Sequence, residues 1–251
     1  MNSKEILVAA GRDFLRANWE RREAVPSDQS KGVPAPAQQK PCPQGGRIVE
    51  LVPRDQLSIG SMPLIEAITN RCSRRKFDGS ALSLEEISFL LWAVQGLRER
   101  GGTRSFRTVP SGGCRHGFET YLYSGRVAGL EEGLYRYLPL DHRLCHLRSG
   151  ADLRERLDEA LYDQYWDSAA VFLWTVVPYR MEWRYTVVAH KILALDAGHV
   201  CQNLYLACES IGCGTCAIGA YDQKKLDAFL GVDGEEEFAI YAAPVGKALH
   251  S

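Results

Sequence analysis

A run of basic residues stands out in a chain whose charges otherwise almost cancel. Arg71, Arg74, Arg75 and Lys76 lie within six positions and enclose the hydroxyl group of Ser73. Guanidinium groups, a hydroxyl and free backbone N–H groups together bind phosphate well, so this segment could hold a phosphate group. In an extended backbone, Arg71, Ser73 and Arg75 would point to one side and the other two cations to the opposite side. The alternative is a basic turn that contacts only solvent.

A glycine-containing loop is the second candidate for chemistry. Pro110, Ser111, Gly112 and Gly113 follow one another with little side-chain bulk, so a flat ring could lie against their backbone. The alternative is an ordinary glycine turn before the strand that we expect at residues 120–124. His116 comes shortly after the loop, and a lone histidine in such a place is more typical of a structural role.

Two further segments could approach a ligand near the end of the chain. Gly212–Thr215 follows a predicted helix, whereas a dinucleotide-binding fingerprint follows a strand and opens a helix, so we exclude that fold. Cys213 and Cys216 form a Cys-x-x-Cys pair. No second pair has zinc-ligand spacing and the context is not that of thioredoxin, so we expect no metal site. Lys247 follows a predicted buried strand and could reach an anion or simply end in solvent.

The elements that position these segments can be predicted from caps and hydrophobic period. Ser83 and Glu86 form a capping box for a helix that should end near Gly96, and Asp152 with Glu155 repeats the pattern. Gly231 suits a left-handed helix end. We expect further helices over residues 1–20, 190–211 and 222–231, and strands over 120–124, 134–138, 170–177 and 238–243.

The helix predicted over residues 190–211 carries small residues beside its apolar stripe. Ala194, Gly198 and Cys201 fall on neighbouring turns, and small residues allow another helix to approach closely. This pattern fits either an ordinary core helix or a helix that packs against its symmetry mate in a dimer.

Composition limits the class of protein. The chain has 251 residues, 45% of them apolar, and a formal net charge of −1, so neither nucleic acid nor a membrane surface is an expected partner. We find no signal-peptide pattern and no membrane-spanning stretch, and we expect a cytoplasmic protein with its eight cysteines reduced. Residues 1–57 should form a helix and a proline-rich extension on the surface, and residues 58–251 the compact part.

In this order and spacing, the segments resemble the nitroreductase family of FMN enzymes, and in particular its SagB-type dehydrogenase branch. The Arg71–Phe77 element, the Pro110–Gly113 loop and the Gly212–Thr215 turn resemble family motifs. The same holds for residues 133–137 (GLYRY), 196–204 (DAGHVCQNL), 244–247 (PVGK) and 28–32 (DQSKG).

The resemblance implies an α+β fold with a central mixed or antiparallel sheet flanked by helices, in an intertwined homodimer with two FMN sites at its interface. The arginine segment would hold the phosphate and ribityl chain, the proline loop would lie along the isoalloxazine, and the second glycine turn would approach its reactive edge. Lys247 would close on the phosphate. The cofactor-binding residues so implied are Arg71, Cys72, Ser73, Arg75, Pro110, Ser111, Gly112, Gly113, Gly212, Cys213, Gly214, Thr215 and Lys247.

The resemblance also implies a reaction. NADH or NADPH would reduce the flavin, which would then reduce a small acceptor such as a nitroaromatic or a quinone, with the acceptor pocket formed by residues 96–107 and 163–185. Azoline-oxidising members of the branch carry a Lys-Tyr pair where this chain has Arg184-Tyr185, and arginine cannot act as a base near neutrality. Azoline oxidation on a modified peptide, or non-enzymatic flavin binding or storage, are the alternatives. We assign no catalytic residue.

Overall fold

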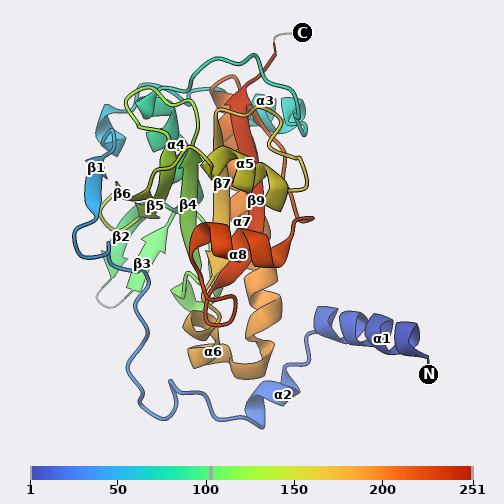
Figure 1. Ribbon diagram of the computed structural model, residues 1–251. Coiled ribbons are helices and arrows are strands. Elements are labelled where there is room, and N and C mark those ends of the chain that lie inside the picture. Colours follow the sequence, from blue (N-terminus) through green and yellow to red (C-terminus); the bar gives the residue numbers. More distant parts are fainter. Residues whose placement is uncertain (1, 102–103, 250–251) are drawn as a thin grey trace.

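The computed structural model describes residues 2–101 and 104–249, which form an α+β fold around one large antiparallel sheet (Figure 1). The seven strands follow the order β1-β6-β5-β4-β7-β9-β8, and β2 pairs with β3 in a separate hairpin. The bounds are β1 Arg47–Glu50, β2 Leu97–Gly101, β3 Arg104–Arg107, β4 Phe118–Ser124, β5 Gly133–Leu138, β6 Arg143–Arg148, β7 Ala170–Val176, β8 Cys213–Thr215 and β9 Phe238–Lys247.

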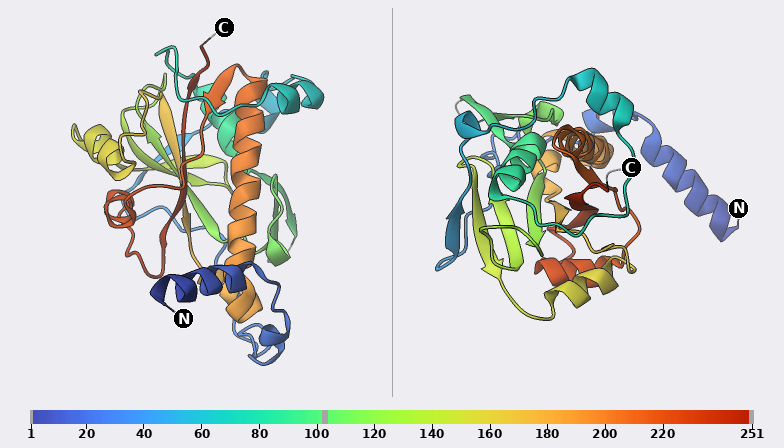
Figure 2. Two further views of the ribbon diagram at one scale, coloured as in Figure 1. Left: turned by 90° about the vertical axis from the view of Figure 1, so that its right-hand side faces the viewer. Right: turned by 90° about the horizontal axis from the view of Figure 1, so that it is seen from above.

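Helices cover both faces of the sheet. One hydrophobic cluster joins α4 and α7 to one face, and a second joins α5 and α8 to the other (Figure 2). Because β4, β5 and β7 are covered on both sides, every residue in them is buried. The helices are α1 Ser3–Leu15, α2 Glu20–Glu23, α3 Leu64–Asn70, α4 Leu84–Gln95, α5 Leu153–Ala160, α6 Tyr179–Tyr185, α7 Ala189–Ser210 and α8 Gln223–Leu230.

The local signals for helix ends are largely confirmed. Ser83 and Glu86 form the predicted capping box at the start of α4. Gly231 ends α8 in the left-handed conformation, with φ of 74°. The second predicted box is wrong, because the Asp152 side chain makes no capping bond at the start of α5 and pairs with Arg156 instead.

The N-terminal residues form an arm and then a strap. None of the residues of α1 is buried, and the helix stands out from the body (Figures 1 and 2). Residues 33–43, which we call the strap, then follow the surface of the body, where Arg136 donates to the carbonyl of Pro41 and Leu140 N–H donates to the side chain of Gln39. The strap thus lies along the surface of the body, whereas β1, which follows it, belongs to the sheet.

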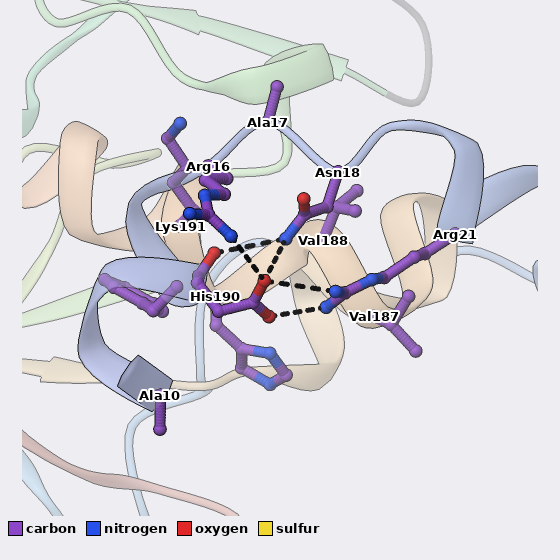
Figure 3. A pocket seen from close by; sticks show the side chains of 11 residues that line it. Ala10, Arg16, Ala17, Asn18, Arg21, Val187, Val188, His190 and Lys191 are labelled. Atoms are coloured by element: carbon purple, nitrogen blue, oxygen red, sulfur yellow. Dashed lines mark hydrogen bonds and ion pairs between the residues drawn. The ribbon is translucent and has the colours of Figure 1, made fainter. Parts of the chain in front are cut away.

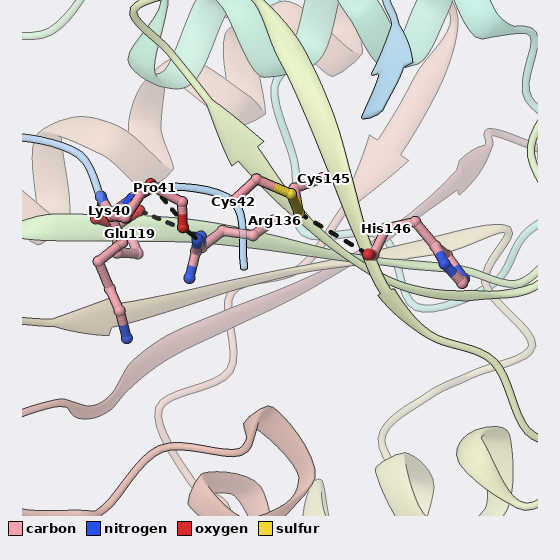
Figure 4. The surroundings of a disulfide bond; sticks show 7 residues. All are labelled: Lys40, Pro41, Cys42, Glu119, Arg136, Cys145 and His146. Atoms are coloured by element: carbon pink, nitrogen blue, oxygen red, sulfur yellow. Dashed lines mark hydrogen bonds and ion pairs between the residues drawn. A yellow bond between two sulfur atoms is a disulfide. The ribbon is translucent and has the colours of Figure 1, made fainter. Parts of the chain in front are cut away.

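One cysteine pair corrects the expectation of reduced thiols. Cys42 at the end of the strap and Cys145 in β6 form a disulfide with 5.8 Å between their Cα atoms (Figure 4). The strap carries Cys42 to the sheet edge, where the separation lies in the ordinary disulfide range. The two cysteines are 103 positions apart, so no local pattern marks the pairing. The other six cysteines are free thiols.

Within the described residues, no helix combines the length and apolar character that crossing a membrane requires.

Candidate functional site

Three of the four predicted segments meet at the C-terminal end of α7. Ser73 forms a bridge with Thr215, and the Arg74 N–H donates to the Thr215 carbonyl at 3.0 Å. In the β8–β9 ladder Cys213 lies opposite Lys247, and Gly214 lies opposite Gly246. Backbone pairing thus brings together residues 71–77, 212–215 and 246–247, which we call the β8 end.

Two glycines allow the arginine segment to lie directly on the sheet edge. A Cβ at Gly214 would come within 2.7 Å of Arg74 Cδ, and a Cβ at Gly246 within 2.7 Å of the Phe77 ring. Contacts this short are not tolerated between carbon atoms, so both positions require glycine for the observed packing.

The side chains of Arg71 and Ser73 lie together as predicted, whereas Arg75 lies against a different aromatic ring. Ser73 Oγ lies 3.0 Å from the hydroxyl oxygen of Tyr205, and the Arg71 guanidinium lies 5.5 Å from the centroid of that ring. Arg74 turns elsewhere and pairs with Glu209 on α7. Arg75 lies over the ring of Trp166 at 5.6 Å.

Charge is divided unevenly at the β8 end. Lys247 pairs with Glu86, as Arg74 does with Glu209, so both of these cations are already balanced by a carboxylate. In the described part of the chain, Arg71 and Arg75 have no carboxylate partner. These two guanidinium groups and the Ser73 hydroxyl are therefore the groups available to an anion, whereas the predicted reach of Lys247 would require it to leave Glu86.

The cysteines of this region differ in exposure. Cys72 is exposed, whereas Cys213 and Cys216 are buried. Burial raises the pKa of the Cys213 thiol to about 12, with Glu86 adding to the effect, so this thiol stays protonated. Cys213 therefore offers a ligand its backbone rather than its sulfur.

The fourth predicted segment, Pro110–Gly113, lies near the N-terminal half of α7. The Gly112 N–H donates to Asp196 Oδ2 at 3.1 Å, which anchors the loop to that helix. Ser111 Oγ accepts the N–H of His116 at 2.9 Å. Gly113 has φ of 58°, and a Cβ there would lie 2.8 Å from the Tyr185 hydroxyl. We call residues 110–116 and the side chains that hold them the loop end.

His116 is a structural residue of the loop end. Its Nε2 lies 2.8 Å from the Ser105 carbonyl oxygen, so this nitrogen carries the proton. Burial lowers the pKa of His116 to about 3, and the neighbouring cation of Arg107 contributes. The imidazole is thus neutral near pH 7, as suits a structural histidine.

The strap closes over the loop end. Ser105 donates to the Gln38 side-chain oxygen from its N–H at 3.0 Å and from its hydroxyl at 2.8 Å. The Lys40 N–H donates to Glu119 Oε1 at 2.8 Å, and the same carboxylate forms a buried ion pair with Arg180. The strap therefore completes a network of buried charge directly beside the loop.

The two ends lie at opposite parts of the same helix within a single chain. Asp196, which holds the loop, and Glu209, which holds Arg74, are 13 positions apart on α7. At 1.5 Å per residue the helix separates them by about 20 Å. The structure thus brings three predicted segments together and leaves the fourth at the far end of the same helix.

Both segments predicted to form an acceptor pocket reach the loop end. Arg98 and Phe106 of the β2–β3 hairpin line a hollow of about 340 Å³ with Pro110 and Ser111. On the α6 side, Arg184 and Tyr185 contact Gly113. A separate hollow of about 220 Å³ lies between α1 and the first turn of α7, where Arg21 pairs with Asp13 (Figure 3).

Several residues of the site were not predicted as members of it. Tyr205, Glu209 and Glu86 hold the β8 end, and Gln38 holds the loop end. They act through contacts between residues far apart in the sequence, so no local pattern marks them. Asp196 lay within a motif that we compared with the family, but its role as anchor of Gly112 was not foreseen.

Comparison with known proteins agrees with this architecture. The Nitroreductase family model matches residues 68–247. A Methanocaldococcus jannaschii protein that carries the name of a nitroreductase is 30% identical over 192 residues, covering 76% of this chain and 94% of that protein. The trifolitoxin-processing protein TfxB of Rhizobium leguminosarum bv. trifolii is 30% identical over 112 residues, covering 42% of this chain and 30% of its own length.

Solved structures show the same fold. A Ralstonia eutropha JMP134 protein described as a nitroreductase superposes with a TM-score of 0.67 and 26% identity, covering 87% of this chain and 94% of that chain. The E. coli microcin synthetase McbBCD complex with truncated pro-MccB17 bound gives a TM-score of 0.61 at 19% identity, over 80% of this chain and 84% of that chain.

Proposed function

The chain belongs to the nitroreductase family, and from this premise we propose that it is an FMN-dependent oxidoreductase that acts as a homodimer. Its electrons would come from NADH or NADPH and pass to a small acceptor such as a nitroaromatic or a quinone. Members of this family are oxidoreductases, while the identity of the flavin, the donor and the acceptor belongs to the proposal.

The uncompensated cations at the β8 end are the observation that carries the proposal. Arg71 and Arg75 have no carboxylate partner among the described residues, and Ser73 adds a hydroxyl between them. Two guanidinium groups and a hydroxyl on an exposed segment are the donors that a phosphate monoester requires. The residues present therefore fit the phosphate of FMN.

The loop end supports the second half of the same ligand. Gly112 and Gly113 present backbone without side-chain bulk, and Asp196 holds the loop in place from α7. A flat ring can lie against such a surface. When bound, FMN supplies hydride and electron transfer, and the chain supplies binding and orientation.

A second copy of the chain would complete the site. Ala194, Leu195, Gly198 and Gln202 are exposed along α7, and a Cβ at Gly198 would meet no atom within 4 Å. Leu64, Ile65 and Ile68 of α3 are also exposed. Packing α7 against its two-fold mate would cover this face and carry the loop end of one chain toward the β8 end of the other. The separation of about 20 Å along α7 is the reason to expect this arrangement.

A second candidate function is the oxidation of azoline rings in a modified peptide. It is favoured by the similarity to the trifolitoxin-processing protein and by the Tyr185 hydroxyl at Gly113. Arg184 weighs against it, because arginine stays protonated and cannot accept a proton. The nitroaromatic or quinone acceptor is therefore our first choice.

Purification without added cofactor tests the proposal. We expect yellow protein that elutes as a dimer and releases about one FMN per chain on heating, and that oxidises NADH or NADPH with menadione or a nitrofuran. Arg71→Gln with Arg75→Gln should weaken FMN binding at least about tenfold. Arg47→Gln with Arg143→Gln, which alters surface pairs with Glu131 and Glu50, is the charge-matched control. Colourless protein that does not bind added FMN would exclude the proposed function.

A further inference from the structure

The surroundings of Tyr185 form an unusual concentration of positive charge. Arg184 lies over the Tyr185 ring at 5.4 Å, and Arg22 of the N-terminal arm lies over the same ring at 6.0 Å. Trp19 stacks on Tyr185 with 6.0 Å between the ring centroids and places the arm there. The Tyr185 hydroxyl itself lies at Gly113 of the loop. Two guanidinium groups from distant parts of the chain thus flank one ring at the loop end.

Two more arginines extend this charge. The Arg115 guanidinium donates to the carbonyl oxygens of Arg180 and Pro36 and lies over Trp183 at 4.6 Å, and it forms no ion pair with a carboxylate of the described residues. Burial lowers the pKa of Arg115, and the cations of Arg184 and Arg104 lower it further. We call Arg22, Arg104, Arg115 and Arg184 the arginine patch.

The neighbouring carboxylates do not neutralise the arginine patch. Glu119 is buried against Arg180, and Glu182 is bonded to His190. Asp196 is engaged by the Gly112 N–H. In the part of the chain that the structure describes, Arg22, Arg104 and Arg184 have no carboxylate within ion-pair distance. Grouping like charges costs free energy, and an anion bound among them would recover it.

We propose that the arginine patch binds the anionic group of a substrate whose reacting part lies on the Pro110–Gly113 loop. This inference rests on the proposed function and adds a substrate class to it: a carboxylate or a phosphate carried beside the reacting ring. Such a group could belong to the acceptor or to the nicotinamide dinucleotide, and the experiment below distinguishes the two.

Arg184 is the residue placed to make the contact. A Cβ at Gly113 would lie 3.0 Å from both Arg184 Cδ and Nε, so this side chain runs along the surface of the loop. It is partly exposed, and its planar guanidinium can hold a carboxylate or phosphate through two parallel hydrogen bonds. A lysine at this position would keep the positive charge but could not form the two parallel hydrogen bonds. Arg184→Lys is therefore expected to bind the anion with intermediate affinity.

The test uses the FMN-loaded protein and measures binding before turnover. Calorimetry with the oxidised protein should show that benzoate binds and that benzamide binds at least about tenfold more weakly. Arg184→Gln should remove the preference, Arg184→Lys should retain part of it, and Arg22→Gln should reduce it. Arg156→Gln on α5, which alters a surface pair with Asp152, is the control and should leave it unchanged. The preference should also weaken as salt increases, because the groups are partly exposed.

Steady-state kinetics then identify the source of the anion. A rise in KM for 4-nitrobenzoate in Arg184→Gln, with 4-nitrobenzamide unaffected, assigns the anionic group to the acceptor. A rise in KM for NADH or NADPH, with both acceptors unaffected, assigns it to the dinucleotide. Unchanged KM values for all of them, with no benzoate preference in the unaltered protein, would overturn the inference. Reduction of menadione by the unaltered protein would show that the proposed function stands independently of this inference, whereas its absence would reject that function.

Discussion

The two ends of α7 are built by different means. At the β8 end, backbone pairing between Ser73 and Thr215 and the β8–β9 ladder fix the geometry, and Gly214 allows the segments to touch. At the loop end, an irregular loop is held by single side-chain contacts such as that of Asp196. Where backbone strand pairing builds a site, added side-chain bulk between the strands should disrupt it. Where side chains hold a loop, loss of a charge or a hydrogen bond should disrupt it. The two ends should therefore fail under different substitutions.

The balance of charge separates the ends as well. Arg74 and Lys247 each have a carboxylate at the β8 end. At the loop end the carboxylate of Glu119 is buried with Arg180 and lies 3.9 Å from Arg136, so one acid serves more than one base. Loss of that single acid should have the greatest effect on the fold.

Glu119→Gln is accordingly the strongest test of the comparison. Without the carboxylate, Arg180 and Arg136 stay buried and unbalanced, and breaking a buried pair in this way costs about 3–5 kcal/mol of unfolding free energy. Urea denaturation followed by fluorescence measures the loss. Glu159→Gln, which alters an exposed pair with Lys225, is the matched control and should change little. Equal effects of the two variants would show that charge does not hold the loop end.

The second largest expected effect is a loss of stability at acidic pH, through His116 at the loop end. The pKa of His116 is lowered to about 3 in the fold by burial, against an ordinary value of 6.5. A base with a depressed folded pKa contributes stability that is present above pH 6.5 and is lost as pH falls toward 3, here a few kcal/mol at most. Urea midpoints measured from pH 7.5 down to 4.5 should fall. The fall should be shallower in His116→Asn than in His199→Asn, whose side chain is half-exposed on α7. If the urea midpoint fell with pH equally steeply in both variants, His116 would not be the cause of the acid sensitivity.

Gly214→Ala probes the β8 end. The new methyl group would lie 2.7–2.8 Å from Arg74 side-chain carbons, so the arginine segment must shift. We expect a loss of about 2 kcal/mol in unfolding free energy together with weaker FMN binding. A Cβ at Gly219 meets no atom within 4 Å, so Gly219→Ala is the control. Unchanged FMN affinity in Gly214→Ala would mean that the close approach does not shape the ligand site.

Asp196→Ala should have the smallest effect. It leaves the Gly112 N–H without its acceptor, which costs about 1 kcal/mol. FMN affinity should fall more than stability does, because the loop remains folded but loses its anchor. Asp196→Asn keeps an acceptor oxygen and should restore most of the affinity. An equal loss in both variants would assign the effect to the charge rather than to the hydrogen bond.

The sequence predicted the features that depend on near neighbours. The Ser83 capping box, the left-handed Gly231 and the buried strand β7 follow from residues within a few positions of one another. The β8 end was predicted as separate segments, and they are joined by backbone pairing between residues 73 and 215 and by the β8–β9 ladder.

Long-range contacts account for what was missed. The edge strand β1 and its neighbour β6 carry weak local patterns, and they pair because the strap brings residues 47–50 back to the sheet. The Arg22–Tyr185 contact and the Cys42–Cys145 bond join residues more than 100 positions apart. The local hydrophobic period around each residue does not reveal contacts with residues so far away in the sequence. Residues 110–116 could therefore be predicted as a loop, but the side chains that surround them could not.

The disulfide also determines how the molecule would respond to force. If the two termini were pulled apart, tension would pass from residue 42 directly to residue 145 through the sulfur atoms. The intervening chain, which includes the β2–β3 hairpin, β4 and β5, would carry no load. In a single-molecule extension experiment the chain between residues 42 and 145 would be hidden, and adding a reductant should release roughly 350 Å of extra length.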